Sequence, residues 1–410
     1  MNNEYWLYIE PYVYLEIKSE SALLYNTLDH EFIIYDDPTI ISLLKDLLSE
    51  SSNGVILLDE NLSNMKVVEK LIFDLKTKFL GDVIDVSLST IKPIQLPPIP
   101  TVQYDIRNEG KVDDSILGDK ILNYLNELTL YLDTYCDCKC PNCFGYNKQL
   151  LFCTQNTNSS YELSFTVLCK LVNELKACNN IQKINLVIQN IAFISKEWDQ
   201  ITSLIAPIKK NIFIYTYYLN YNTEVNIYNL FGDNVCLLID YPLKLKIFEE
   251  IENLRKININ FIVKNDFEYD FFLDVVKKYG ITKYDIYPFY DGTNYDFFKR
   301  RIFLDKIDVV KGVSNIHQIY RNKKINNNYF GKLSISSSGD VFFNLAENTI
   351  GNLLVEDLKK ILFDHFYYED MPWFRIRRNK PCDCCLFQFL CPPPSNYELA
   401  LSKNNLCTLF

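Results

Sequence analysis

The chain is poor in histidine, with three in 410 residues, at positions 30, 317 and 365. They form no His-x-x-x-His pair, so we expect no catalytic zinc or copper site built on histidine. No stretch of about 18 apolar residues occurs, and we therefore expect no membrane-spanning segment. The first residues lack a basic region, and Glu4 and Glu10 interrupt the apolar pattern there. We expect no secretory signal and a cytoplasmic location.

Positive charge is also in deficit. The 52 Asp and Glu residues outnumber the 42 Lys and Arg residues, and the net charge of −10 argues against a nucleic-acid partner. Glycine is scarce, with 12 residues, a compositional bias that assigns no function. The hydrophobic fraction of 48% suffices for large cores, and the length allows two or three domains of roughly 100–200 residues each.

Cysteine, by contrast, is plentiful. Nine of the thirteen cysteines lie in two groups. Disulfide scaffolds are normally short secreted chains with their cysteines spread out, whereas clustered thiolates in a reducing compartment are more often metal ligands. The two groups are Cys136, Cys138, Cys140 and Cys143, and Cys382, Cys384, Cys385, Cys391 and Cys407.

The first group contains a C-x3-C-x2-C motif formed by Cys136, Cys140 and Cys143. This spacing lets one loop bind three corners of a cubane 4Fe–4S cluster and leaves the fourth iron open for chemistry. Cys138 is an extra thiol inside the motif, so four nearby thiolates could instead close around zinc. Cys153 follows shortly after and is either a further ligand or a buried small side chain.

Residues 1–90 are predicted to form a small α+β unit. We expect strands at 12–18, 22–26, 31–35 and 55–58 and helices at 39–48 and 64–79. The unit resembles the winged-helix modules that recognise leader peptides by adding them to an exposed sheet edge. The alternative is a structural cap on the next domain. Residues 91–114 contain Pro93, Pro97, Pro98 and Pro100 and are predicted to be a linker.

Residues 115–290 alternate between strand and helix patterns. About six strand–helix units predict an α/β fold with a parallel sheet. Because the segment is too short for eight units, we expect an open, partial (β/α)6 barrel. In such folds sites form at the C-terminal ends of the strands, and the first cysteine group follows the first strand. Expected strands are 128–133, 183–188, 212–217, 235–239, 259–263 and 283–287, and expected helices are 165–176, 197–205, 243–255 and 269–279, with a short helix between 115 and 127.

A first strand that ends in this cysteine motif, followed by a six-unit barrel, resembles the radical S-adenosylmethionine (radical SAM) enzymes. The resemblance implies that Cys136, Cys140 and Cys143 hold a 4Fe–4S cluster whose open iron binds SAM and yields a radical that abstracts hydrogen. Family members carry a Gly-Gly-Glu turn after the second strand, close to the SAM amino group. This chain has Gln189 and Asn190 there, whose side chains are the candidate SAM-binding groups.

Residues 291–410 resemble a SPASM extension, which carries auxiliary iron–sulfur clusters. The resemblance assigns Cys382, Cys385, Cys391 and Cys407 to one closed 4Fe–4S cluster, with Cys384 as a bystander. A second family cluster is lost, because Ser395 and Asn344 stand where that pattern has cysteines.

The whole chain resembles a narrower group, the pseudo-radical-SAM/SPASM proteins of double-glycine-leader peptide systems. This resemblance implies a role in peptide maturation, with a precursor peptide as partner and also a partner maturase and an electron donor. The shared stretches are 24–27, 150–154, 330–333, 373–377 and 390–398.

Three hypotheses follow. The first is an active radical SAM peptide maturase, favoured by the intact cysteine motif. The second is a pseudoenzyme that keeps its clusters, binds the precursor and supports a partner enzyme, favoured by the missing glycine turn. The third is a zinc-stabilised binding protein.

Overall fold

The structure is a computed structural model that describes most of the chain. The predicted linker beyond residue 93 and much of the first cysteine loop, including Cys136, Cys138 and Cys153, lie outside the described residues. The described residues are 4–89, 91–93, 120–133, 140, 142–151, 165–176, 178, 180–208, 211–220, 232–243, 256–313, 315–366 and 371–409.

The N-terminal unit contains two three-stranded antiparallel sheets, with strand orders β5-β1-β6 and β2-β3-β4. The four predicted strands and both predicted helices are present, and β1 and β6 were not predicted. Asp37 begins α1 because its carboxylate accepts the N–H groups of Thr39 and Ile40 and Pro38 takes the first helical position. The elements are β1 Tyr5–Ile9, β2 Val13–Lys18, β3 Ser21–Asn26, β4 Phe32–Tyr35, α1 Pro38–Leu48, β5 Val55–Leu58, α2 Glu60–Ser63, α3 Lys66–Thr77 and β6 Gly81–Asp85.

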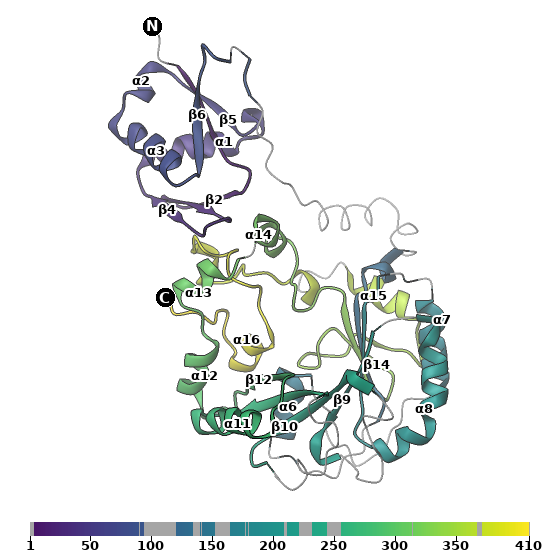
Figure 1. Ribbon diagram of the computed structural model, residues 1–410. Coiled ribbons are helices and arrows are strands. Elements are labelled where there is room, and N and C mark those ends of the chain that lie inside the picture. The colour runs from purple at the N-terminus through teal and green to yellow at the C-terminus, as the bar shows by residue number, and fades with distance from the viewer. Residues whose placement is uncertain are drawn as a thin grey trace.

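A nine-stranded open sheet dominates the rest of the molecule, in the order β12-β11-β10-β9-β8-β7-β13-β14-β15 (Figure 1). Strands β7 to β12 are all parallel, as predicted, so the chain has a mixed α/β fold. β13 adds parallel to β7, and β14 and β15 continue antiparallel, so strands from beyond residue 291 extend the same sheet. The strands are β7 Glu127–Tyr131, β8 Lys183–Val187, β9 Asn211–Tyr217, β10 Val235–Asp240, β11 Asn258–Val263, β12 Tyr284–Pro288, β13 Lys332–Ile335, β14 Asp340–Phe342 and β15 Gly351–Asn352.

Two predicted helix boundaries were wrong. Helix α8 begins at Ile191 and not at residue 197, and a 3-10 turn at Ile121–Tyr124 stands in the described part of the short helix predicted before β7. Most of the helix predicted at 243–255 lies outside the described residues. The other helices are α6 Cys143–Gln149, α7 Phe165–Leu175, α8 Ile191–Ile205, α11 Asp266–Tyr279, α12 Tyr295–Ile302, α13 Lys306–Lys311, α14 Ile316–Asn322, α15 Leu358–Phe366 and α16 Asn396–Leu401. None of the described helices is both long and apolar enough to span a membrane.

The N-terminal unit packs directly on the C-terminal region. Figure 1 shows the purple unit with its β2–β4 sheet toward α13, α14 and the yellow C-terminal segment. Tyr14, Leu23 and Tyr25 share a buried apolar cluster with Cys385 and Cys391. The N-terminal unit therefore packs on the segment that carries Cys385 and Cys391, with direct contacts between Phe32 and Phe387 and between Lys18 and Gln388.

Candidate functional site

The structure brings the four cysteines assigned to the second cluster into one region, here called the C-terminal thiol group: Cys382, Cys385, Cys391 and Cys407. Cys382 starts a 3-10 turn that ends before Cys385, and all four are free thiols. The first three are buried and Cys407 is half-buried. Cys407 is held in place because the backbone of Leu304 bonds to the residues on either side of it.

The four thiols share one electrostatic environment. Burial raises the pKa of the Cys391 thiol to about 12; the Arg377 guanidinium opposes this rise, and the thiols of Cys407, Cys385 and Cys382 add to it. The pKa values of Cys382 and Cys385 are likewise raised, first by burial and also by neighbours in the same group. A bound metal would hold these thiols as thiolates despite the raised values, because metal binding displaces the proton.

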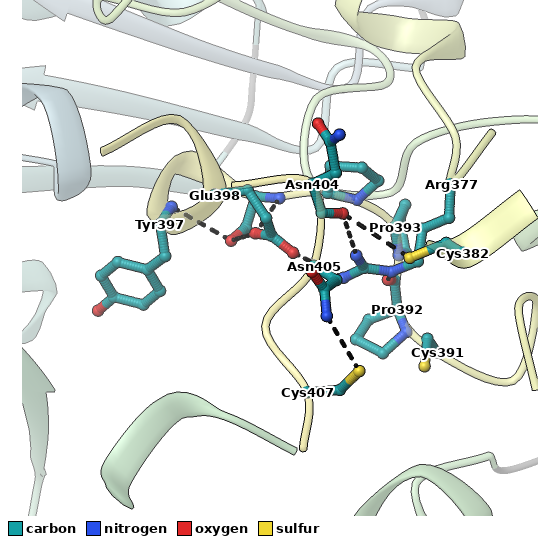
Figure 2. A network of polar contacts seen from close by, with 12 residues as sticks. Arg377, Cys382, Cys391, Pro392, Pro393, Tyr397, Glu398, Asn404, Asn405 and Cys407 are labelled. Atoms are coloured by element: carbon teal, nitrogen blue, oxygen red, sulfur yellow. Dashed lines mark hydrogen bonds and ion pairs between the residues drawn. The ribbon is translucent and has the colours of Figure 1, made fainter. Parts of the chain in front are cut away.

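Arg377 organises the two segments that carry the thiols (Figure 2). Its Nε donates to the Pro392 carbonyl over 2.5 Å, next to Cys391, and its Nη1 donates to the Asn404 carbonyl over 3.2 Å, near Cys407. Its Nη2 forms a buried ion pair with Glu398 Oε1 at 2.7 Å. Burial alone would lower the pKa of Arg377, but Glu398 and the nearby thiols raise it, so the cation is permanent. A fixed positive charge beside thiolates offsets their negative charge.

Glu398 connects this network to a helix start. Its second oxygen accepts from the Ser395 hydroxyl at 2.6 Å and the Ser395 N–H at 2.9 Å, which completes a capping box at the start of α16. Ser395 stands where the SPASM pattern has a cysteine, and in this chain it is a helix N-cap. An N-cap contributes about 1 kcal/mol to stability.

This donor set fits an iron–sulfur cluster. Four thiolates on one zinc ion lie within about 4 Å of one another, because each Zn–S bond is about 2.3 Å. Within the described ranges, no three His, Cys, Asp or Glu side chains approach closely enough to hold a single metal ion. Four thiolates are also the usual ligands of a four-iron cluster, so these residues fit such a cluster in type and number. Cys384 is exposed, with its Sγ at 3.2 Å from the Asp383 carboxylate.

The two described cysteines of the first group, Cys140 and Cys143, lie at the C-terminal edge of the parallel sheet. β7 leads through Asp133 to the loop, and Cys143 begins α6, with its N–H donating to the Cys140 carbonyl at 3.2 Å. Cys140 is buried and Cys143 half-buried. The structure thus brings two of the three motif cysteines together at the predicted edge, and Cys136 lies outside the described residues.

The turn after β8 is held by an acid that sequence reasoning missed. The buried Asp133 carboxylate accepts the N–H of Gln189 at 3.1 Å from both oxygens and the N–H of Asn190 at 3.1 Å. The Gln189 side chain is also buried, with its Nε2 at 3.4 Å from the Asp133 carbonyl. A strand-terminal Asp before a cysteine motif was the only sequence signal. Binding of SAM by Gln189 and Asn190 stays a prediction.

A second buried carboxylate occupies the same edge. Asp240, at the end of β10, accepts the hydroxyl of Tyr146 at 2.7 Å and that of Tyr217 at 2.5 Å. Tyr146 lies in α6, so this contact holds the helix that follows Cys143 against the sheet. Burial is the main cause that raises the pKa of both tyrosines, and Asp240 adds to it, so both hydroxyls keep their protons.

No protein-family model matches the chain, and no curated protein matches it. Three of the solved structures that are similar to this chain at low identity illustrate the comparison. Streptococcus suis SuiB bound to S-adenosylmethionine is 15% identical over 97% of each chain, with a TM-score of 0.43. Native anSMEcpe with bound AdoMet and Cp18Cys peptide is 12% identical over 65% of this chain and 88% of that one, with a TM-score of 0.40. BtrN in complex with AdoMet and 2-DOIA is 13% identical over 59% of this chain and 85% of that one, with a TM-score of 0.27. At these values the similarities carry no argument about this chain, whose function must be inferred from its own residues.

Proposed function

We propose that this chain is an iron–sulfur protein of the radical SAM/SPASM type that takes part in maturation of a ribosomally made, leader-bearing peptide in the cytoplasm. The observation that carries the proposal is the convergence of the C-terminal thiol group around the Arg377 network. Four thiolates bind every iron of a cubane, so this cluster serves electron transfer or structure and not substrate binding.

In this proposal Cys136, Cys140 and Cys143 hold the reactive 4Fe–4S cluster. With SAM on its open iron, that group supplies the radical hydrogen abstraction from the peptide, with electrons from a donor protein. The chain contributes a buried position for Cys140, and Asp133 holds the neighbouring turn in one conformation. Gln189 and Asn190 would then orient SAM beside the cluster.

A pseudoenzyme is the second candidate, and the same turn favours it. The N–H groups of Gln189 and Asn190 are already engaged by Asp133, and no glycine allows close approach of a ligand to this backbone. Asp240, the other acid at this edge, is engaged by two tyrosine hydroxyls. In this candidate the chain keeps its clusters, binds the precursor and supports a partner maturase.

One experiment separates the candidates. Anaerobically reconstituted protein is incubated with SAM and a strong reductant, and iron and 5′-deoxyadenosine are quantified. Iron with deoxyadenosine supports the maturase, and iron without deoxyadenosine supports the pseudoenzyme. Stoichiometric zinc with no iron would overturn both and leave the zinc-stabilised binding protein.

We also propose that the N-terminal unit binds the leader of the precursor at a strand edge. The edge strands of its two described sheets are β5, β6, β2 and β4. β2 contacts α14, which leaves the other three as candidates. Ile34 on β4 and Leu57 on β5 are large apolar side chains that are exposed on edge strands. A synthetic leader peptide ending in Gly-Gly is titrated against Ile34→Lys and Leu57→Lys variants of the full chain. Unchanged affinity in both would leave the unit as a structural cap.

A further inference from the structure

A cavity of about 440 Å³ lies between the sheet and the C-terminal region. The floor is one face of the parallel strands, because Glu127 pairs in register with Lys183 and Asn260 with Leu238. The wall is formed by segments 328–329 and 395–397. This volume is within the range of small-ligand sites, about 300–1,000 Å³. We call it the Lys332 cavity, after the lysine at the start of β13 that lines it.

A smaller cavity of about 190 Å³ shares several of these residues and extends to Asn344. Asn344 and Ser395, the two positions where the SPASM pattern has cysteines, therefore line one or other of the two hollows. The region that would otherwise hold metal ligands is lined by an amide and a hydroxyl.

The charged side chains of the cavity are unbalanced. Glu127 lies 3.6 Å from Lys183 and 3.6 Å from Lys332, and it also accepts from Asn185 Nδ2 at 2.7 Å. Burial raises the pKa of Glu127, but Lys332 and Lys183 outweigh this and lower it, so the carboxylate is ionised. Among the described residues that line the cavity, two ammonium groups therefore face one carboxylate, which leaves one excess positive charge.

Two of the side chains that line the cavity, Lys332 and Asn396, have donors for a ligand. The Lys332 ammonium lies at ion-pair distance from Glu127 but forms no side-chain hydrogen bond within the described chain. Asn396 Oδ1 accepts from Asn344 Nδ2 at 2.6 Å and from the Tyr329 hydroxyl at 2.8 Å, which identifies its Nδ2 as the group left to donate. Of the other amides in the lining, Gln149 holds the backbone of Tyr290 through both ends, and Asn328 Nδ2 donates to the carbonyls of Pro393 and Pro394.

We infer that the Lys332 cavity binds an acidic residue of the peptide substrate, with its carboxylate on Lys332 and Lys183 and its backbone on Asn396. This inference rests on the proposed function for the identity of the ligand as a peptide. The single excess charge matches one carboxylate, and the retained Glu127 repels a multiply charged anion such as phosphate. The cavity adjoins the end of α6, whose first residue is Cys143, so a bound peptide lies next to the element that carries the first cluster.

The test uses two capped pentapeptides, acetyl-Ala-Ala-Glu-Ala-Ala-amide and its Gln counterpart, titrated against the full chain. We expect the Glu peptide to bind about tenfold more tightly than the Gln peptide, because its hydrogen bonds to lysine are charge-assisted. Lys332→Gln should remove this preference, Lys332→Arg should retain it, and Lys277→Gln, an exposed control on α11, should leave it unchanged. The Arg variant and an unfolding curve distinguish loss of the charge from loss of the fold.

Equal binding of the two peptides by the wild type, or an unchanged preference in Lys332→Gln, would overturn the inference. Competition by free glutarate or SAM as strong as that by the Glu peptide would assign the cavity to a small carboxylate and overturn the peptide part. These measurements need neither iron nor deoxyadenosine. If the protein holds no clusters but binds the Glu peptide through Lys332, the proposed function is rejected and the inference about the cavity stands. If the protein holds its clusters but does not bind the Glu peptide, the inference about the cavity is rejected and the proposed function stands.

Discussion

The C-terminal thiol group and the C-terminal edge of the parallel sheet differ in what their charged side chains contact. Around the thiols, Arg377 bonds to backbone carbonyls and to Glu398, and its positive charge opposes the rise that burial causes in the pKa values of Cys382 and Cys391. At the sheet edge, Asp133 and Asp240 are each engaged by donors from the protein itself. The first region is organised to hold a closed group, whereas a ligand at the second must fit around polar groups that already have partners.

Loss of a thiol tests this comparison most severely. We expect about eight irons per reconstituted wild-type chain and about four in Cys391→Ser or in Cys140→Ala, because each variant removes one ligand of one cluster. The exposed Cys384→Ser is the matched control and should keep the full iron content. Iron assay with ultraviolet–visible spectra checks this, and equal iron in Cys391→Ser and the wild type would remove the C-terminal assignment.

Breaking the buried ion pair should give the next largest effect. Arg377→Met leaves the Glu398 carboxylate buried without its partner, and we expect a loss of about 3–5 kcal/mol in the free energy of unfolding. Arg300→Met, at an exposed ion pair with Asp266, is the control and should change little. Denaturant titration measures both. A similar small change in the two variants would show that the Arg377 network does not organise the thiol region.

Opening the turn at the sheet edge tests the other side of the comparison. The double change Gln189→Gly and Asn190→Gly restores close backbone approach while keeping the N–H groups that bond to Asp133. If the turn limits SAM binding, we expect affinity to rise about tenfold, or about 1.4 kcal/mol. Equilibrium binding of SAM to reconstituted protein measures this, and tight binding by the wild type would show that the turn is no obstacle.

The smallest effect concerns the contact of the N-terminal unit with the C-terminal region. Glu16 is buried, which raises its pKa, but Lys323, Tyr14 and Lys18 outweigh burial and lower it. Its stabilising contribution, about 1 kcal/mol, is therefore complete above the unfolded-state pKa near 4.5 and is lost as the pH falls through the lower folded-state value. In Glu16→Gln, the free energy of unfolding should fall less steeply as the pH is lowered between about 6 and 2. An identical pH profile in the variant would remove Glu16 from the contact.

Local patterns predicted most of the elements. The period of apolar residues located the six parallel strands, and Asp37–Pro38 marked the start of α1. The boundary of α8 was missed because the run from Ile191 to Ile194 is as apolar as a strand. The N–H groups of Gln189 and Asn190 donate to the Asp133 carboxylate and not to a neighbouring strand. β8 therefore ends before them, and the helix begins at Ile191.

By itself the sequence predicted the C-x3-C-x2-C ligand motif of Cys136, Cys140 and Cys143, since spacing along one loop is local, and it determined the parallel α/β pattern. Only the tertiary structure decided that β13 lies beside β7, that Asp133 reaches a turn 56 residues away, and that Tyr14 and Tyr25 belong to the same buried cluster as Cys385 and Cys391. The Lys332 cavity likewise joins residues from strands and loops far apart in the chain. Such contacts depend on how whole elements pack, and because packing is non-local, no pattern within a single segment encodes them.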